Sequence, residues 1–184
     1  MDSPKDFNKR HFLFSQLPLA LGLVASSRIA HAELEKADNR NLYLYNLHTQ
    51  ERLECWYYSD GQYLPRSLDR INNLFRDHRT EEQHPIDVNL LNTLFLLSRQ
   101  FSTDAPIEVL SGFRSASTNE MLRRKSQGVA KRSYHMVGQA VDCRFPGVTV
   151  ERLRDEALHA ARGGVGYYPK SNFVHLDSGP VRRW

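Results

Sequence analysis

SYHMVGQAVD, the stretch at residues 133–142, decides how this chain folds and what chemistry it supports. It places His135 and Asp142 seven positions apart, and a second histidine, His175, follows in FVHLD at residues 173–177. Two imidazoles and one carboxylate are ligands that hold a catalytic zinc and leave its fourth position open to water. The stretch therefore indicates a metal-dependent hydrolase with Zn²⁺ as its cofactor.

Strand alternation shows which neighbours of Asp142 face the predicted metal. In a strand over 140–145, Asp142 and Arg144 share one face, while Cys143 points to the other. Cys143 is therefore not expected to be a ligand, although its thiolate has the right chemistry. Gly138 allows the backbone to turn between the first histidine and this strand.

The wider sequence predicts a mixture of strands and helices. We expect strands at 41–47, 53–58, 107–110, 140–145, 163–168 and 173–176, and helices at 64–75, 85–101, 118–124 and 150–162. The first two strands form a hairpin, and the helices have apolar stripes typical of core packing. The fold class is α+β, a small, mainly antiparallel sheet with packed helices.

Residues 1–32 have the features of a secretory signal. Lys9 and Arg10 precede an apolar run that ends before Ala30-His31-Ala32, which predicts cleavage after Ala32 and a single domain at 33–184. Pro18 interrupts the run, which is shorter than the ~20 residues of a membrane span, so no stable span is expected after cleavage. Residues 8–13 resemble a twin-arginine export signal with Lys in the first position, and both export routes stay open.

Composition excludes few other functions. The net charge of +4 falls to +2 without residues 1–32, and no basic helix with interleaved aromatic residues suggests nucleic-acid binding. Cys55 and Cys143 are the only cysteines. In an oxidising compartment they either pair or stay as two separate buried thiols, and we favour separate thiols.

The motifs together resemble those of a known family. They are SGFRS at 111–115, SxHxxGxAxD at 133–142, GxGxYP at 164–169 and FVHxD at 173–177. This set resembles the M15 family of zinc peptidases, and within it the YcbK/MepK type of murein endopeptidase from Gram-negative bacteria. The resemblance extends from Asn41 to Trp184 and implies a hedgehog/DD-peptidase-like fold.

The resemblance also implies roles and a setting. His135, Asp142 and His175 would bind zinc, and Arg114 would hold a substrate carboxylate or an oxyanion, unless it makes only a surface ion pair. The implied activity is metal-assisted hydrolysis of peptide cross-links between peptidoglycan stem peptides in the periplasm. The cross-link joins either two diaminopimelate residues or D-Ala and diaminopimelate.

One position departs from the family. Many M15 members have a Glu as general base three residues before the second histidine, where this chain has Asn172, which cannot take a proton. Asp177 shares a strand face with His175 and is the candidate base. Its alternative role, which we favour, is to orient the ring of His175.

Several alternatives stay open. The enzyme could instead be a D,D- or L,D-carboxypeptidase that trims stem peptides, and the missing Glu is also compatible with a non-catalytic zinc-containing module that binds the cell wall. A structural protein without metal is a third possibility. The basic residues at 123–125 and 131–132 either guide anionic wall polymer or form a solvated loop face, which we favour. Tyr167, Tyr168 and Trp184 are candidates for a groove wall, with at least one expected to pack in the core.

Overall fold

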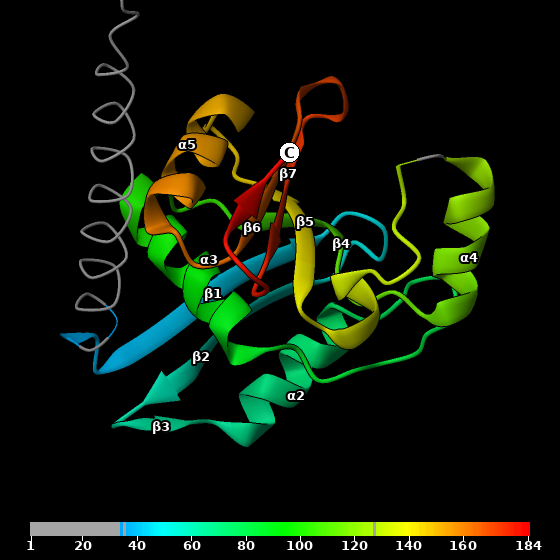
Figure 1. The fold of residues 1–184 in the computed structure, drawn as a ribbon. Coiled ribbons are helices and arrows are strands. Elements are labelled where there is room, and N and C mark those ends of the chain that lie inside the picture. The colour runs from blue at the N-terminus through cyan, green and yellow to red at the C-terminus, as the bar shows by residue number, and fades with distance from the viewer. Residues whose placement is uncertain (1–33, 35, 127) are drawn as a thin grey trace, which may run out of the picture.

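An eight-stranded sheet forms the centre of the protein (Figure 1). The computed structural model describes residues 34, 36–126 and 128–184. The sheet order is β3-β2-β1-β4-β5-β7-β6-β8. Its strands are β1 (Asn39–Asn46), β2 (Arg52–Ser59), β3 (Gln62–Tyr63), β4 (Ile107–Ser111), β5 (Ala140–Arg144), β6 (Gly164–Tyr168), β7 (Phe173–Asp177) and β8 (Arg182–Arg183). The β1–β4 and β6–β8 pairs are parallel and the other neighbours antiparallel, which confirms the predicted α+β class.

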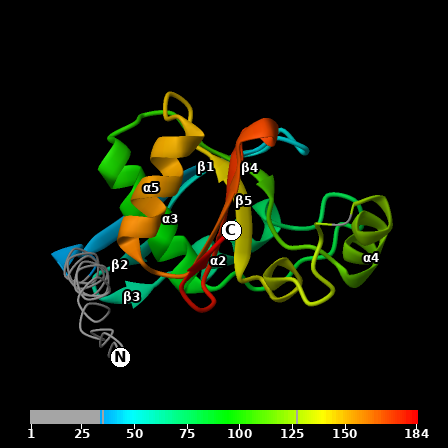
Figure 2. The same cartoon turned by 45° about the horizontal axis from the view of Figure 1, so that its top comes forward.

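Four helices form where the sequence predicted them. They are α2 (Pro65–Leu74), α3 (Val88–Phe101), α4 (Ala116–Lys125) and α5 (Val150–Ala160), joined by the 3-10 turns η1 (Tyr134–Val137) and η2 (Pro169–Ser171). Asp87, Ser115 and Thr149 begin α3, α4 and α5, each with a side-chain oxygen that accepts a hydrogen bond from a first-turn backbone N–H. Both views show α3 beside α5, while α4 stands apart from the other helices (Figures 1 and 2).

One hydrophobic cluster joins α2, α3 and α5 to one face of the sheet. Along β1, Leu42 and Leu44 are buried while their neighbours are more exposed, as the alternation predicted. α3 packs on β1 and on α5, and α5 packs on β6 and β7. Along β5, Asp142 and Arg144 lie on the opposite face and are only partly buried.

Cys55 and Cys143 are separate buried thiols in the structure. Cys55 lies on β2 and Cys143 on β5, with β1 and β4 between them. Three strand spacings amount to roughly 14 Å, about twice the largest separation that a disulfide can bridge. The alternative that we favoured from the sequence is therefore confirmed.

The predicted signal at residues 1–32 lies outside the described residues. Among the described helices, none is both long and apolar enough to cross a bilayer.

Candidate metal centre

His135 lies in η1, a turn that local contacts define at both ends. Ser133 begins it, with Oγ accepting a hydrogen bond from the His135 N–H. Gly138 ends it at a φ of 66°, in the left-handed region that favours glycine. A Cβ at Gly138 would also lie 2.1 Å from the carbonyl oxygen of Pro85, so the chain has room for no other residue here.

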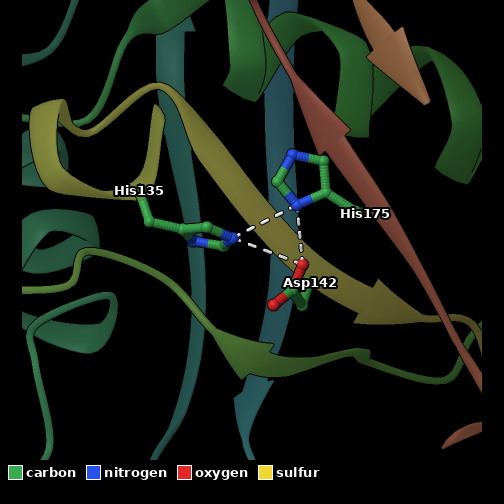
Figure 3. Close-up of side chains that lie close together, drawn as sticks. All are labelled: His135, Asp142 and His175. Carbon is green, nitrogen blue, oxygen red and sulfur yellow. Dashed lines mark hydrogen bonds and ion pairs between the residues drawn. The ribbon is translucent and has the colours of Figure 1, made fainter. Parts of the chain in front are cut away.

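Asp142 and His175 face each other on neighbouring antiparallel strands, β5 and β7. Their side chains and that of His135 point toward a common centre (Figure 3). His175 Nδ1 lies 2.8 Å from Asp142 Oδ1, and His135 Nε2 lies 3.3 Å from the same oxygen. The two ring nitrogens are 3.2 Å apart. The three residues predicted as ligands are thus brought together.

These spacings match those of zinc ligands. Tetrahedral zinc with bonds of about 2.0–2.1 Å holds its ligand atoms roughly 3.3 Å apart. The three atoms are 2.8–3.3 Å apart. Among the described residues, His135, Asp142 and His175 form a group whose side chains can together hold a metal ion. Cys143 is fully buried in the core and takes no part, as strand alternation predicted.

The remaining nitrogen of each histidine has a partner of its own. His135 Nδ1 lies 2.7 Å from the carbonyl oxygen of Gly112 and must donate to it, which leaves Nε2 free to bind a metal. His175 Nε2 lies 3.1 Å from Asp177 Oδ2. Such partners fix the tautomer and the ring orientation of metal-binding histidines. The two rings would therefore bind a metal through different nitrogens, Nε2 for His135 and Nδ1 for His175.

Electrostatics also favour a cation at this centre. Burial lowers the pKa of His135, which keeps its imidazole neutral as a ligand must be. Burial alone would raise the pKa of Asp142, but the two histidines outweigh it and hold this pKa well below its usual range. Burial likewise lowers the pKa of His175, and hydrogen bonds to Asp142 and Asp177 outweigh it and raise the pKa. The two carboxylates thus stabilise positive charge at the position of His175.

Arg114 lies beside the centre with part of its guanidinium unused. Its Nη2 is 3.0 Å from Ser111 Oγ and 3.4 Å from Asp142 Oδ2, and its side chain is mostly buried. Its Nε is buried without a hydrogen-bond partner among the described residues. The guanidinium also lines the cleft described below, where a bound group can reach it. Arg114 is thus not a surface ion pair.

Four hydrogen bonds fix the loop that bears Arg114. The backbone N–H of Arg114 donates to His135 O, that of Phe113 donates to Phe75 O, and that of Ser115 donates to Asp77 Oδ2. The fourth is the bond from His135 to the carbonyl of Gly112. This loop and the first ligand therefore hold each other in place.

The centre lines a cleft together with the segment at 128–134 and the β6–β7 hairpin. The lining includes Arg114, the three metal-centre residues, Arg132, Tyr134, Tyr168, Phe173, Arg182 and Trp184. Within this described lining, Asp142 is the sole carboxylate. Asn172 does not line the cleft. It ends η2 at a φ of 53°, a conformation that asparagine tolerates better than most residues.

The candidate base Asp177 lies behind His175. Its side chain has no exposed surface, and it contacts the ring nitrogen of His175 that points away from the centre. This position favours the orienting role over the role of base.

The aromatic and basic candidates divide between the cleft and other surfaces. Tyr168 and Trp184 line the cleft, whereas Tyr167 packs against the core and donates to Glu151. Arg132 also lines the cleft. Arg123 and Arg124 instead pair with Glu120 on α4, as in a solvated helix face.

Sequence analysis missed two residues near the centre, Arg182 and Asp77. Arg182 binds Asp177, and Asp77 binds the loop of Arg114. Neither residue belongs to one of the sequence motifs on which the prediction of the site was based.

Comparison with known proteins identifies the family. Residues 34–184 match the family model described as "Peptidoglycan L,D-endopeptidase MepK". The chain belongs to the MepK family. It is 41% identical over 179 residues to the peptidoglycan L,D-endopeptidase MepK of Escherichia coli strain K12, which covers 97% of this chain and 98% of that protein. It is 40% identical over 181 residues to the probable peptidoglycan L,D-endopeptidase MepK of Haemophilus influenzae, which covers 97% of this chain and 96% of that protein.

MepK membership confirms the resemblance to M15 metallopeptidases inferred from the motifs. The matched range, residues 34–184, contains the metal centre and the lining of the cleft.

Proposed function

We propose that this chain is a zinc-dependent endopeptidase that hydrolyses L,D cross-links between peptidoglycan stem peptides. The observation that supports it best is the group of three ligand atoms at zinc-like spacing beside Arg114, which lines the same cleft. The names of the MepK relatives supply the substrate class and the L,D bond. Such a bond joins the carbonyl of an L-centre to the amine of a D-centre, as in a link between two diaminopimelate residues.

His135, Asp142 and His175 would hold the zinc, which supplies Lewis-acid activation of a carbonyl and of water when bound. Arg114 would donate from its guanidinium to a carboxylate of the substrate or to the oxyanion that develops during attack. A planar fork with two donors suits both groups. Donors already in position for an oxyanion are often the largest electrostatic contribution to catalysis.

We assign Asp177 to the orientation of His175, not to proton transfer. A base must reach the attacking water in the cleft. The buried Asp177 carboxylate instead contacts His175 Nε2, and hydrogen bonds lower its pKa to about 2 although burial raises it. A side chain that stays ionised behind the ligand fits a supporting role.

We further propose that residues 1–32 are a secretory signal and that residues 33–184 act as one domain in the periplasm. The basic, apolar and Ala-x-Ala segments of the sequence support this. Mass spectrometry of the exported protein should show an N-terminus at Glu33. An exported protein that keeps Met1 would contradict it.

The activity is tested by digesting defined muropeptide dimers with residues 33–184. A dimer with a diaminopimelate–diaminopimelate link should yield monomers, and a dimer linked through D-Ala should stay intact. A chelator and His135→Ala should each abolish cleavage. Release of single terminal residues would instead indicate a carboxypeptidase, and wall binding without cleavage would indicate a non-catalytic module.

A further inference from the structure

The strand β8 and the residue after it lie against the metal centre without belonging to its ligand set. We propose that Arg182 and Trp184 are positioning residues that fix the third metal ligand, His175, and close one wall of the cleft. This inference deepens the proposed function and rests on it for the identity of the metal.

The first link is a chain of contacts from Arg182 to His175. Arg182 Nη1 donates to Asp177 Oδ1 at 3.0 Å, and Nη2 donates to Oδ2 at 2.7 Å. Asp177 also accepts the backbone N–H groups of Gly164 and Gly179, at 3.2 and 2.9 Å. A carboxylate held by four donors has one fixed orientation, and its Oδ2 lies 3.1 Å from His175 Nε2. Arg182 also provides the counter-charge that a fully buried carboxylate needs.

The second link connects Arg182 to the first ligand. The guanidinium carbon of Arg182 lies 4.9 Å from the ring centre of Tyr134 and 4.9 Å from that of Trp184. Tyr134 directly precedes His135 in η1. Contacts of a guanidinium with two rings are attractive and hold all three groups in place. Arg182 therefore joins η1, β7 and its own strand at one point.

The third link is the indole of Trp184. Its ring centre lies 5.3 Å from that of His175, and its Nε1 donates to Tyr168 Oη at 2.9 Å. Backbone hydrogen bonds to Val165 and from Tyr167 hold Trp184 beside β6. The side chain is half exposed and lines the cleft, so it shields one side of the His175 ring and faces any substrate.

Two glycines of β6 make room for this arrangement. Gly164 lies opposite Asp177, and Gly166 lies opposite His175. A Cβ at Gly166 would lie 2.7–2.9 Å from three indole atoms of Trp184, and a Cβ at Gly164 would lie 2.5 Å from Arg182 Nη1. Neither glycine has a positive φ, so space and not backbone conformation requires them. The side chains of Arg182 and Trp184 therefore explain why β6 has glycine at both positions.

The test measures zinc affinity by competition with a chromophoric chelator, which needs no substrate. Arg182→Gln should weaken zinc binding by about tenfold, the lower end of the effect of losing a direct partner of a ligand histidine, because Arg182 acts through Asp177. Arg182→Lys should recover part of the loss. Arg183→Gln is the matched control, because Arg183 is the exposed neighbour on β8, and it should bind zinc as the wild type does. Melting temperatures of the zinc-free variants separate loss of the centre from loss of the fold.

Gly166 and Trp184 are tested together in a double-mutant cycle. Trp184→Ala and Gly166→Ala should each weaken zinc binding about tenfold. The double variant should be no weaker than Trp184→Ala alone, because the added methyl then has no indole to displace. Trp56→Ala, at an exposed tryptophan on β2, is the control and should have no effect.

Two results would overturn the proposal. One is zinc affinity within twofold of the wild type in both Arg182→Gln and Trp184→Ala. The other is a double variant whose loss equals the product of the two single losses, which means that Gly166 acts independently of Trp184. If the wild type binds zinc but cleaves no dimer, the proposed substrate fails while these affinity measurements still decide the roles of Arg182 and Trp184.

Discussion

Asp77→Asn should destabilise the protein and impair catalysis, although Asp77 does not line the metal cleft. The Asp77 side chain is buried and accepts the backbone N–H groups of Arg79 and Ser115 at 3.0 and 2.8 Å. Ser115 directly follows Arg114, so the charge of Asp77 anchors the loop that presents this arginine. Asparagine keeps one acceptor oxygen but turns an NH₂ group toward a backbone donor.

The magnitude follows from the pKa of Asp77. Burial alone would raise this pKa, but hydrogen bonds from Thr118, Ser115 and Arg79 outweigh burial and lower it from 3.8 to about 2. A lowered pKa means that the ionised form stabilises the fold above pH 4, by about 2 kcal/mol. That contribution is lost as the pH falls from about 4 to about 2. The loosened Arg114 should also lower kcat by about tenfold.

The assay is urea unfolding of the zinc-free protein from pH 7 to pH 2.5, so that the metal adds no pH dependence of its own. Asp77→Asn should be about 2 kcal/mol less stable than the wild type at pH 7, and the difference should shrink below pH 4. Asp104→Asn, at an exposed aspartate, is the control and should change little. An equal loss of stability at pH 7 and pH 2.5 would refute the electrostatic reasoning, because it would not depend on ionisation.

Three further predictions concern the cleft and the core. Arg114→Lys should lower kcat on the order of 100-fold, since a single ammonium cannot replace the two-donor guanidinium fork. Normal turnover would exclude a role of Arg114 in stabilising the oxyanion. Cys143→Ser should lower the free energy of unfolding by about 1–3 kcal/mol, because a hydroxyl replaces a fully buried thiol. The variant should still bind zinc. A variant that binds no zinc would contradict the conclusion that Cys143 points away from the metal centre. Arg132→Gln should raise KM about three- to fivefold at constant kcat, and Lys131→Gln, which does not line the cleft, should have no effect in the same steady-state assay.

The elements that the sequence predicted best are those with a regular pattern. Alternation along β1 and capping residues such as Asp87 and Thr149 act locally, so neighbouring residues decide them. β3 and β8 were not predicted because two residues show no periodicity. They exist only because an edge of the sheet is available to pair with them.

The parts of the candidate site that could be predicted are those that depend on motif spacing and on the alternation of side chains along a strand. His135, Asp142 and His175 were named from motifs, and alternation along β5 excluded Cys143 correctly. The role of Asp77 depends on a contact between residues 38 positions apart, which spacing does not reveal. The choice of metal-binding nitrogen in each ring likewise depends on partners brought together by tertiary structure.

The three candidate ligands and the two residues proposed to position His175 come late in the sequence. His135, Asp142 and His175 belong to η1, β5 and β7, and Arg182 and Trp184 follow them. A ribosome therefore finishes the first strands and helices before any metal ligand exists, and Trp184 takes its place over His175 after all of them. A nascent chain that lacks these residues has no complete hydrolytic centre, so the order of synthesis itself delays the activity until they have been added.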